Sequence, residues 1–175
     1  MAAVTTNILA DTVARLDVSR SFHADPGLLC RALTNPGWLG QVVESPPDRP
    51  DLIRVETDLA FTLRSDGRPL VFRKAALVDI GVGMAGAGTE PGCTGEIAWR
   101  ASSFSPLFPI FAGRLIVGPS RLQIEGVYAP PGGQLGLLID RAMTHRFAER
   151  TARWFLDQLV TELRDIDSRE GASPA

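Results

Sequence analysis

The chain has few of the residues that build metal sites and disulfide frameworks. It contains 175 residues, of which only two are cysteines and two are histidines. Cys30 and Cys93 stand far apart and belong to no CxxC-type motif, so they predict neither a disulfide framework nor a metal site. We therefore expect no metal and no cofactor.

The chain also has no long apolar run and no stretch dominated by one charge. No uncharged apolar segment approaches about 18 residues, so no membrane span is predicted. The opening MAAVTTNILADTVARL has no basic region, and Asp11 interrupts its apolar run, which does not fit a secretory signal. Acidic and basic residues are interspersed at a net charge of −2, which gives nucleic acid no basic patch to bind. We expect a cytoplasmic protein.

The composition that is present is that of an ordinary globular domain. Hydrophobic residues make up 45% of the chain and charged residues 22%. The length favours a single domain with a substantial core. We predict three regions, which are an N-terminal arm at 1–12, one domain at 13–167 and a disordered tail at 168–175.

The last third of the chain carries the clearest structural signal. A strand pattern at 121–128 is followed by APPGG, which stops a sheet ladder because proline lacks an N–H donor. Residues 134–167 then follow a helical period, which corresponds to a helix of about 50 Å. A helix of this length after a run of strands usually lies across a sheet.

The elements before it are shorter. The sequence predicts a strand at 15–22 and a helix with Asp25 as N-cap and Pro26 in its first turn, ending at 35–37. A second short helix is predicted at 38–43. Further strands are predicted at 53–63, 70–80, 95–101 and 111–117, before the strand at 121–128. The order of elements indicates an α+β domain.

Two segments resemble one known superfamily. These are FHADPGLLCRALTNPGWL, which begins at Phe22, and GVYAPPGGQLGLLIDR, which begins at Gly126 and leads to HRFAERTARWFL from His145. They are similar to START-like proteins, the SRPBCC or helix-grip superfamily that includes the birch-pollen allergen, over roughly residues 13–166. The resemblance implies a helix-grip fold, in which a curved antiparallel sheet of about six or seven strands wraps around the long C-terminal helix. It also implies two short helices after the first strand and an apolar cavity between sheet and helix.

The superfamily has several functions, and the fold alone does not choose among them. We predict binding of a small hydrophobic molecule, lipid-like or polyketide-like, without catalysis. The first alternative is a polyketide cyclase or aromatase that uses His145 as general acid and base. The second is a protein-interaction module of the co-chaperone kind, in which the cavity is collapsed.

Alternation in the strands points apolar side chains to one side of the sheet, where they either fill a core or line a pocket. Among them we take Phe61, Phe72, Trp99 and Tyr128 as candidate ligand contacts. The full set is Ile53, Val55, Leu59, Phe61, Leu70, Phe72, Ile97, Trp99, Leu115, Val117, Leu122, Ile124 and Tyr128.

The long helix has one apolar face with a histidine in it. His145 falls among small and apolar residues, and Glu149 follows one turn later at the margin. His145 either contacts a ligand or is satisfied within the core by a backbone carbonyl or by Glu149. Their spacing of four suits two metal ligands, but no third ligand is evident. The face comprises Leu138, Ala142, Ala148, Ala152, Leu156, Leu159 and Leu163, and Ala142, Glu149 and His145 are candidate ligand contacts.

Two further apolar features have alternative interpretations. Met143, Phe147 and Trp154 form a second helix stripe, which is covered by the N-terminal segment or first helices, or else forms a homodimer contact. The segment 104–111 caps a pocket, joins the core or contacts a partner. The GxGxxG match at 81–86 is not expected to bind a dinucleotide, because strand rather than helix follows it.

Overall fold

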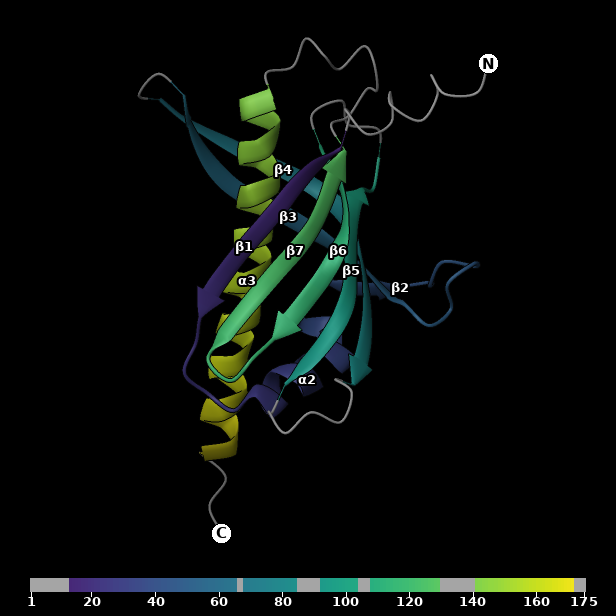
Figure 1. The fold of residues 1–175 in the computed structure, drawn as a ribbon, viewed down its shortest axis with the longest axis vertical. Coiled ribbons are helices and arrows are strands. Elements are labelled where there is room, and N and C mark those ends of the chain that lie inside the picture. The colour runs from purple at the N-terminus through teal and green to yellow at the C-terminus, as the bar shows by residue number, and fades with distance from the viewer. Residues whose placement is uncertain (1–12, 66–67, 85–91, 104–107, 130–140, 172–175) are drawn as a thin grey trace, which may run out of the picture.

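The computed structural model describes residues 13–65, 68–84, 92–103, 108–129 and 141–171 (Figure 1). At 60–65, 68–70, 72, 82–84, 141–143, 167 and 169–171 the description covers the backbone only. Seven strands form one antiparallel sheet in the order β1-β7-β6-β5-β4-β3-β2. The elements are β1 (Ala14–Ser21), α2 (Pro26–Thr34), the 3-10 turn η1 (Pro36–Trp38), β2 (Gln41–Val43), β3 (Ile53–Ser65), β4 (Arg68–Met84), β5 (Cys93–Ala101), β6 (Ile110–Val117), β7 (Arg121–Ala129) and α3 (Arg141–Gly171).

The α+β class and the strand pattern are confirmed. Figure 1 shows α3 running along one side of the curved sheet, with α2 at the end where β5 begins. The start of α2 follows its sequence signal, because the Asp25 carboxylate accepts a hydrogen bond from the Gly27 amide at 3.0 Å.

The prediction of a second short helix at 38–43 is wrong. A 3-10 turn ends at Trp38, and Gln41–Val43 then pairs with β3 as an edge strand. A six-residue helix is too short to be stable without tertiary contacts, whereas a strand gains ladder hydrogen bonds at once. Gly40 permits the approach, because a Cβ there would lie 2.2 Å from the Glu56 carbonyl oxygen.

The predicted disordered tail begins too early. Helix α3 continues to Gly171, and the Ser168 hydroxyl donates a hydrogen bond of 2.7 Å to the Arg164 carbonyl within it. The helix is longer than its apolar stripe, because polar residues also extend a helix that is already formed. The predicted start at 134, the arm at 1–12 and the residues after 171 lie outside the described residues.

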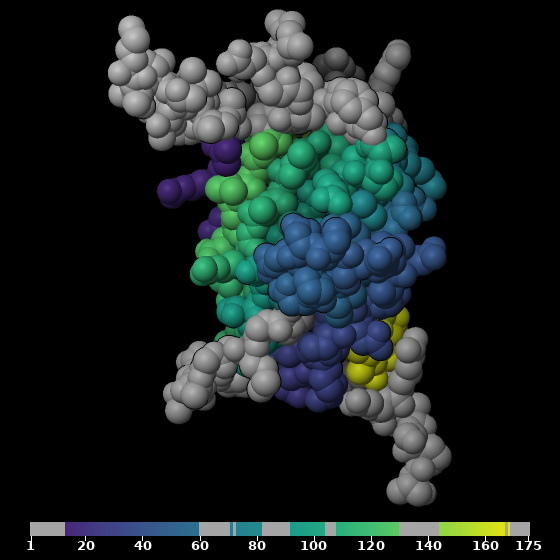
Figure 2. Space-filling view, turned by 90° about the vertical axis from the view of Figure 1, so that its right-hand side faces the viewer, coloured from purple at the N-terminus to yellow at the C-terminus, as the bar shows by residue number. Residues whose placement is uncertain are grey.

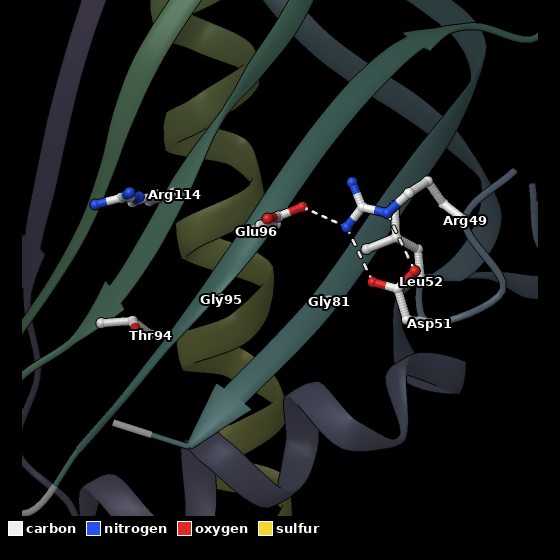
Figure 3. Close-up of a pocket in the computed structure, with 8 residues that line it drawn as sticks. All are labelled: Arg49, Asp51, Leu52, Gly81, Thr94, Gly95, Glu96 and Arg114. Atoms are coloured by element: carbon white, nitrogen blue, oxygen red, sulfur yellow. Dashed lines mark hydrogen bonds and ion pairs between the residues drawn. The ribbon is translucent and has the colours of Figure 1, made fainter. Parts of the chain in front are cut away.

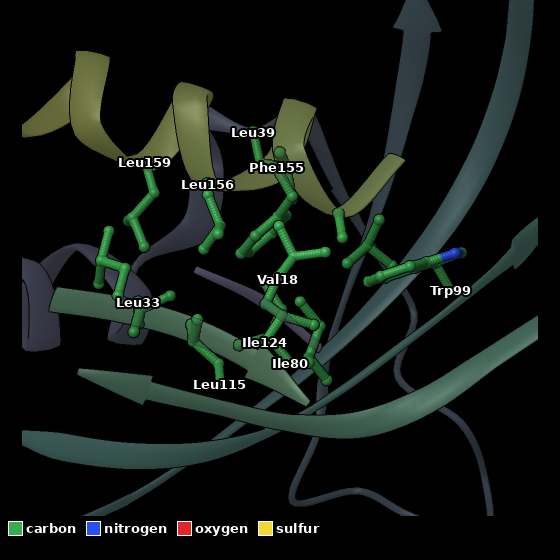
Figure 4. Close-up of a cluster of buried hydrophobic side chains, with 14 of the residues drawn as sticks. Val18, Leu33, Leu39, Ile80, Trp99, Leu115, Ile124, Phe155, Leu156 and Leu159 are labelled. Atoms are coloured by element: carbon green, nitrogen blue, oxygen red, sulfur yellow. The ribbon is translucent and has the colours of Figure 1, made fainter. Parts of the chain in front are cut away.

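The core lies between the sheet and α3, on the side to which the alternation points the apolar side chains (Figure 4). Ile53 is only half-buried, and the side chains of Phe61, Leu70 and Phe72 are outside the described set. On α3, Ala148, Ala152, Leu156, Leu159 and Leu163 are buried against the sheet side. The buried strand residues from the predicted set are Val55, Leu59, Ile97, Trp99, Leu115, Val117, Leu122, Ile124 and Tyr128.

A disulfide joins the two cysteines, contrary to the expectation from sequence. Cys30 on α2 and Cys93 at the start of β5 are bonded, with their Cα atoms 6.0 Å apart. The expectation failed because it rested on spacing along the chain, whereas α2 folds across the end of the sheet and meets β5 there. The bond links the helix to the sheet.

Candidate functional site

Three aromatic residues form a row on the helix-facing side of the sheet. Trp99 on β5 is the register partner of Phe111 on β6, which is in turn the partner of Tyr128 on β7. All three are at most 4% exposed. The rings of Trp99 and Phe111 are stacked, with centroids 3.9 Å apart and planes 15° from parallel. We call these three residues the aromatic row.

Two glycines make room for this row. Gly113 and Gly126 are register partners on β6 and β7. A Cβ at Gly113 would lie 2.6 Å from Phe111 Cζ, and one at Gly126 would lie 2.8 Å from the same atom. Both distances are shorter than van der Waals contact, so a side chain at either position would clash with the Phe111 ring. The ring therefore packs directly against the backbone of the two glycines. The glycines thereby allow Phe111 to lie flat beside Trp99.

The structure brings together two residues that the sequence nominated separately. The Tyr128 hydroxyl lies 3.1 Å from His145 Nδ1, and their ring centroids are 5.9 Å apart. The hydroxyl can donate to an unprotonated Nδ1 or accept from a protonated one. Tyr128 is buried while His145 is exposed, so the pair spans from the core to the surface near the start of the described part of α3.

The Trp99 side chain carries an unusual polar atom. Its indole Nε1 is buried and has no hydrogen-bond partner among the described residues. In Figure 4 this nitrogen points away from the cluster around Leu33 and Leu115. A buried donor without a partner costs about 1–3 kcal/mol, and such groups are rare in folded proteins. The sequence predicted Trp99 only as an apolar ligand contact. It did not indicate that the indole N–H would lack a partner among the described residues.

The other nominated contacts are not part of this group. The Glu149 carboxylate accepts a hydrogen bond of 2.6 Å from Arg153, one turn along α3, rather than one from the His145 ring. The side chains of Phe61, Phe72 and Ala142 lie outside the described residues. Within the part of the chain that the structure describes, no group of three His, Cys, Asp or Glu residues is arranged to hold a metal ion.

The second helix stripe is not a free surface. Phe147 is 2% exposed and Trp154 packs partly against the core, while the Met143 side chain lies outside the described residues. Phe147 is thus covered within a single chain, which removes the centre of the suggested dimer contact. In the segment 104–111, Phe108 and Phe111 are also buried.

The described part of the glycine motif, residues 81–84, lies in a strand. Strand β4 continues through Met84, so no helix begins between Gly81 and Met84, and 85–86 lie outside the described residues. Among the described residues, no helix is long and apolar enough to cross a membrane.

A separate hollow of about 540 Å³ lies on the outer face of the sheet (Figure 3). Arg49, in the segment before β3, forms ion pairs with Asp51 at 2.9 Å and with Glu96 on β5 at 2.7 Å. The Leu52 side chain of this segment packs directly over Gly81. A Cβ added to Gly81 would lie 2.5 Å from Leu52 Cδ2. The Arg49 guanidinium pairs with both carboxylates and thereby links the segment 49–52 to β5. We call these two ion pairs the clamp.

Lowering the pH should open this clamp. The hydrogen bond from Arg49 lowers the pKa of the Asp51 carboxylate below its ordinary value. The carboxylate therefore stabilises the closed segment at neutral pH, and this contribution is lost as the pH falls through the lowered pKa. We expect the amides of Arg49 and Leu52, which donate hydrogen bonds to the carbonyls of Pro46 and residue 49, to lose protection from hydrogen exchange at acidic pH. In Arg49→Gln they should lose it already at neutral pH.

Arg114→Gln is the control for the clamp, because Arg114 lines the same hollow from β6. It should leave protection at neutral pH unchanged. Equal protection of the amides of residues 49 and 52 in the wild type and in Arg49→Gln would show that the ion pairs do not hold the segment.

Comparisons with protein-family models, with curated proteins and with solved structures found no match to this chain.

Proposed function

We propose that this protein binds one small, mainly apolar molecule at the aromatic row, between the sheet and the beginning of α3. The resemblance of its sequence to START-like proteins supports a helix-grip fold with a ligand at this position. The single observation that carries the proposal is the buried Trp99 N–H, which has no partner in the part of the chain that the structure describes. A ligand acceptor would compensate for the hydrogen bond that this donor lost on leaving water.

The row also suits a flat ligand. Trp99 and Phe111 already stack on each other, and aromatic faces favour offset stacking with further rings. Tyr128 and His145 supply a second polar contact, and the exposure of His145 puts it at the solvent side of the site. A mostly apolar wall with a few polar groups is the usual composition of small-molecule sites.

The hydrogen bond between Tyr128 and His145 favours a cyclase or aromatase as the second candidate function. An imidazole oriented by a hydroxyl can exchange protons with a substrate and with solvent. A catalyst usually gathers more titratable groups, and Glu149 is instead engaged by Arg153. Binding without turnover is therefore the preferred function, and the co-chaperone alternative has no described residue that favours it.

The disulfide indicates the kind of compartment in which the protein would carry out this function. Disulfides persist in oxidising compartments and are rare in the cytosol of most organisms. The Cys30–Cys93 bond therefore favours an oxidising environment over the cytoplasmic location expected from sequence.

Replacing Trp99 tests the proposal. With anilinonaphthalene sulfonate as the probe, an apolar aromatic molecule that carries a sulfonate acceptor, we expect Trp99→Phe to weaken binding by about tenfold or more, because a hydrogen bond to a charged group is lost. The free energy of unfolding should change by only about 1 kcal/mol, because the lost packing is offset by removal of the orphan donor. Fluorescence titration and denaturant unfolding measure the two quantities.

Trp38→Phe is the matched control. The Trp38 indole already donates a hydrogen bond of 2.9 Å to the Ala32 carbonyl, and the residue packs against Phe155. This variant should lose stability but keep the affinity for the probe. Unchanged affinity in Trp99→Phe would remove the indole from the site and overturn the proposal.

A further inference from the structure

The distal half of β3 has an open edge. Strand β2 pairs with β3 only at Arg54–Glu56, and the pairing with β4 runs to Ser65. Among the described residues, no strand pairs with the outer edge of β3 at 58–65. Figure 1 shows this part of the hairpin extending past α3. An unpaired edge presents free N–H and C=O groups to any further strand.

The open edge begins beside a hollow in the surface. A hollow of about 640 Å³ adjoins it where β2 begins, and Thr57 and Asp58 from β3 line this hollow with Trp154 and Gln158 from α3. On the side toward η1 the Thr57 hydroxyl donates a hydrogen bond of 2.6 Å to the Leu39 carbonyl, which fixes the point where the open edge begins.

The sequence of this edge is complementary to itself. Gly40 lies against Thr57, since a Cβ on Gly40 would come within 3.2 Å of the Thr57 Cα, so the open edge begins at Asp58. Residues 58–64 of this edge have Phe61 as their midpoint. In an antiparallel two-fold pairing centred on Phe61, position 58 of one chain stands opposite position 64 of the other. Asp58 and Arg64 occupy these positions, so the pairing places opposite charges across the interface twice.

The other long open edges do not have this property. The edge of β4 at 68–74 carries Arg68, Arg73 and Lys74 without an acidic residue, and Pro69 removes a donor. On β1, a two-fold pairing centred on Asp17 would set the Asp17 carboxylates of the two chains opposite each other. Proline and like charges are the features by which natural sheets prevent edge pairing. The edge of β3 has neither.

We propose that two copies of this chain associate through the open edge of β3, so that their sheets become continuous. The interface is isologous, with residues 58–64 of each chain paired antiparallel about Phe61. It differs from the contact through Met143, Phe147 and Trp154 that the sequence suggested. It also does not depend on the ligand proposed above.

Exchanging the two charges tests this interface. Sedimentation velocity over a range of protein concentrations should show a dimer for the wild type, weakened by roughly tenfold in Asp58→Arg and in Arg64→Asp. The double variant Asp58→Arg/Arg64→Asp should regain the wild-type affinity, because the opposite charges face each other again. The amides of 58–64 should gain hydrogen-exchange protection as the dimer forms.

Arg73→Asp is the control, because Arg73 is an exposed residue on β4, outside the paired edge. It should leave the dimer unchanged. A monomeric wild type at every concentration would overturn the proposal, and so would a double variant as weak as the two single ones. An equal effect of Arg73→Asp would show that net charge rather than register governs association.

Discussion

Removing the Cys30–Cys93 disulfide should lower the free energy of unfolding by about 4 kcal/mol. The bond closes a loop with a sequence separation of 63, and cross-linking such a long loop strongly restricts the unfolded chain. It also fixes α2 to the start of β5, at the end of the sheet opposite the aromatic row. We therefore expect the double variant Cys30→Ala/Cys93→Ala to lose stability but to bind the sulfonate probe at temperatures where it is folded.

Denaturant unfolding with and without dithiothreitol measures this effect. The reductant should lower the midpoint of the wild type and have no influence on the double variant. Thiols that can be alkylated in the native, unreduced protein would contradict the disulfide, as would a wild-type midpoint that ignores the reductant.

Gly113→Ala should be the second most damaging change, with a loss of about 3 kcal/mol. The new Cβ would lie 2.2 Å from the Glu125 carbonyl oxygen and 2.6 Å from Phe111 Cζ. The ring can move, but the carbonyl belongs to the ladder between β6 and β7 and cannot move cheaply. Displacement of Phe111 from Trp99 should also weaken binding of the sulfonate probe.

Gly118→Ala provides the comparison. A Cβ at Gly118 would lie 3.4 Å from the Arg121 carbonyl oxygen, which is ordinary contact. This variant should keep nearly the wild-type stability and probe affinity in the same unfolding and titration experiments. Similar losses in both glycine variants would mean that close packing beneath Phe111 is not the cause.

The sequence predicted those elements whose signals are local. The cap at Asp25 and Pro26 located α2, and alternation of apolar residues located the strands that face α3. The prediction failed at 38–43 because β2 is specified by its partner β3 rather than by its own residues. A strand of three residues carries too little periodicity to be recognised alone.

The candidate site was predicted only in part, for a similar reason. Tyr128 and His145 were nominated from their positions in a strand and on a helix face, but their contact depends on how α3 lies on the sheet. The unpaired Trp99 N–H and the disulfide are also products of tertiary packing. No local pattern encodes which buried donor lacks a partner or which distant cysteines meet.

The most direct test of ligand binding is native mass spectrometry of freshly purified protein, followed by organic extraction. We expect each chain to carry one small molecule that is mainly apolar and has an oxygen acceptor, and Trp99→Phe to retain less of it than the wild type. A wild-type chain of unliganded mass that also fails to bind the sulfonate probe would contradict the proposed function.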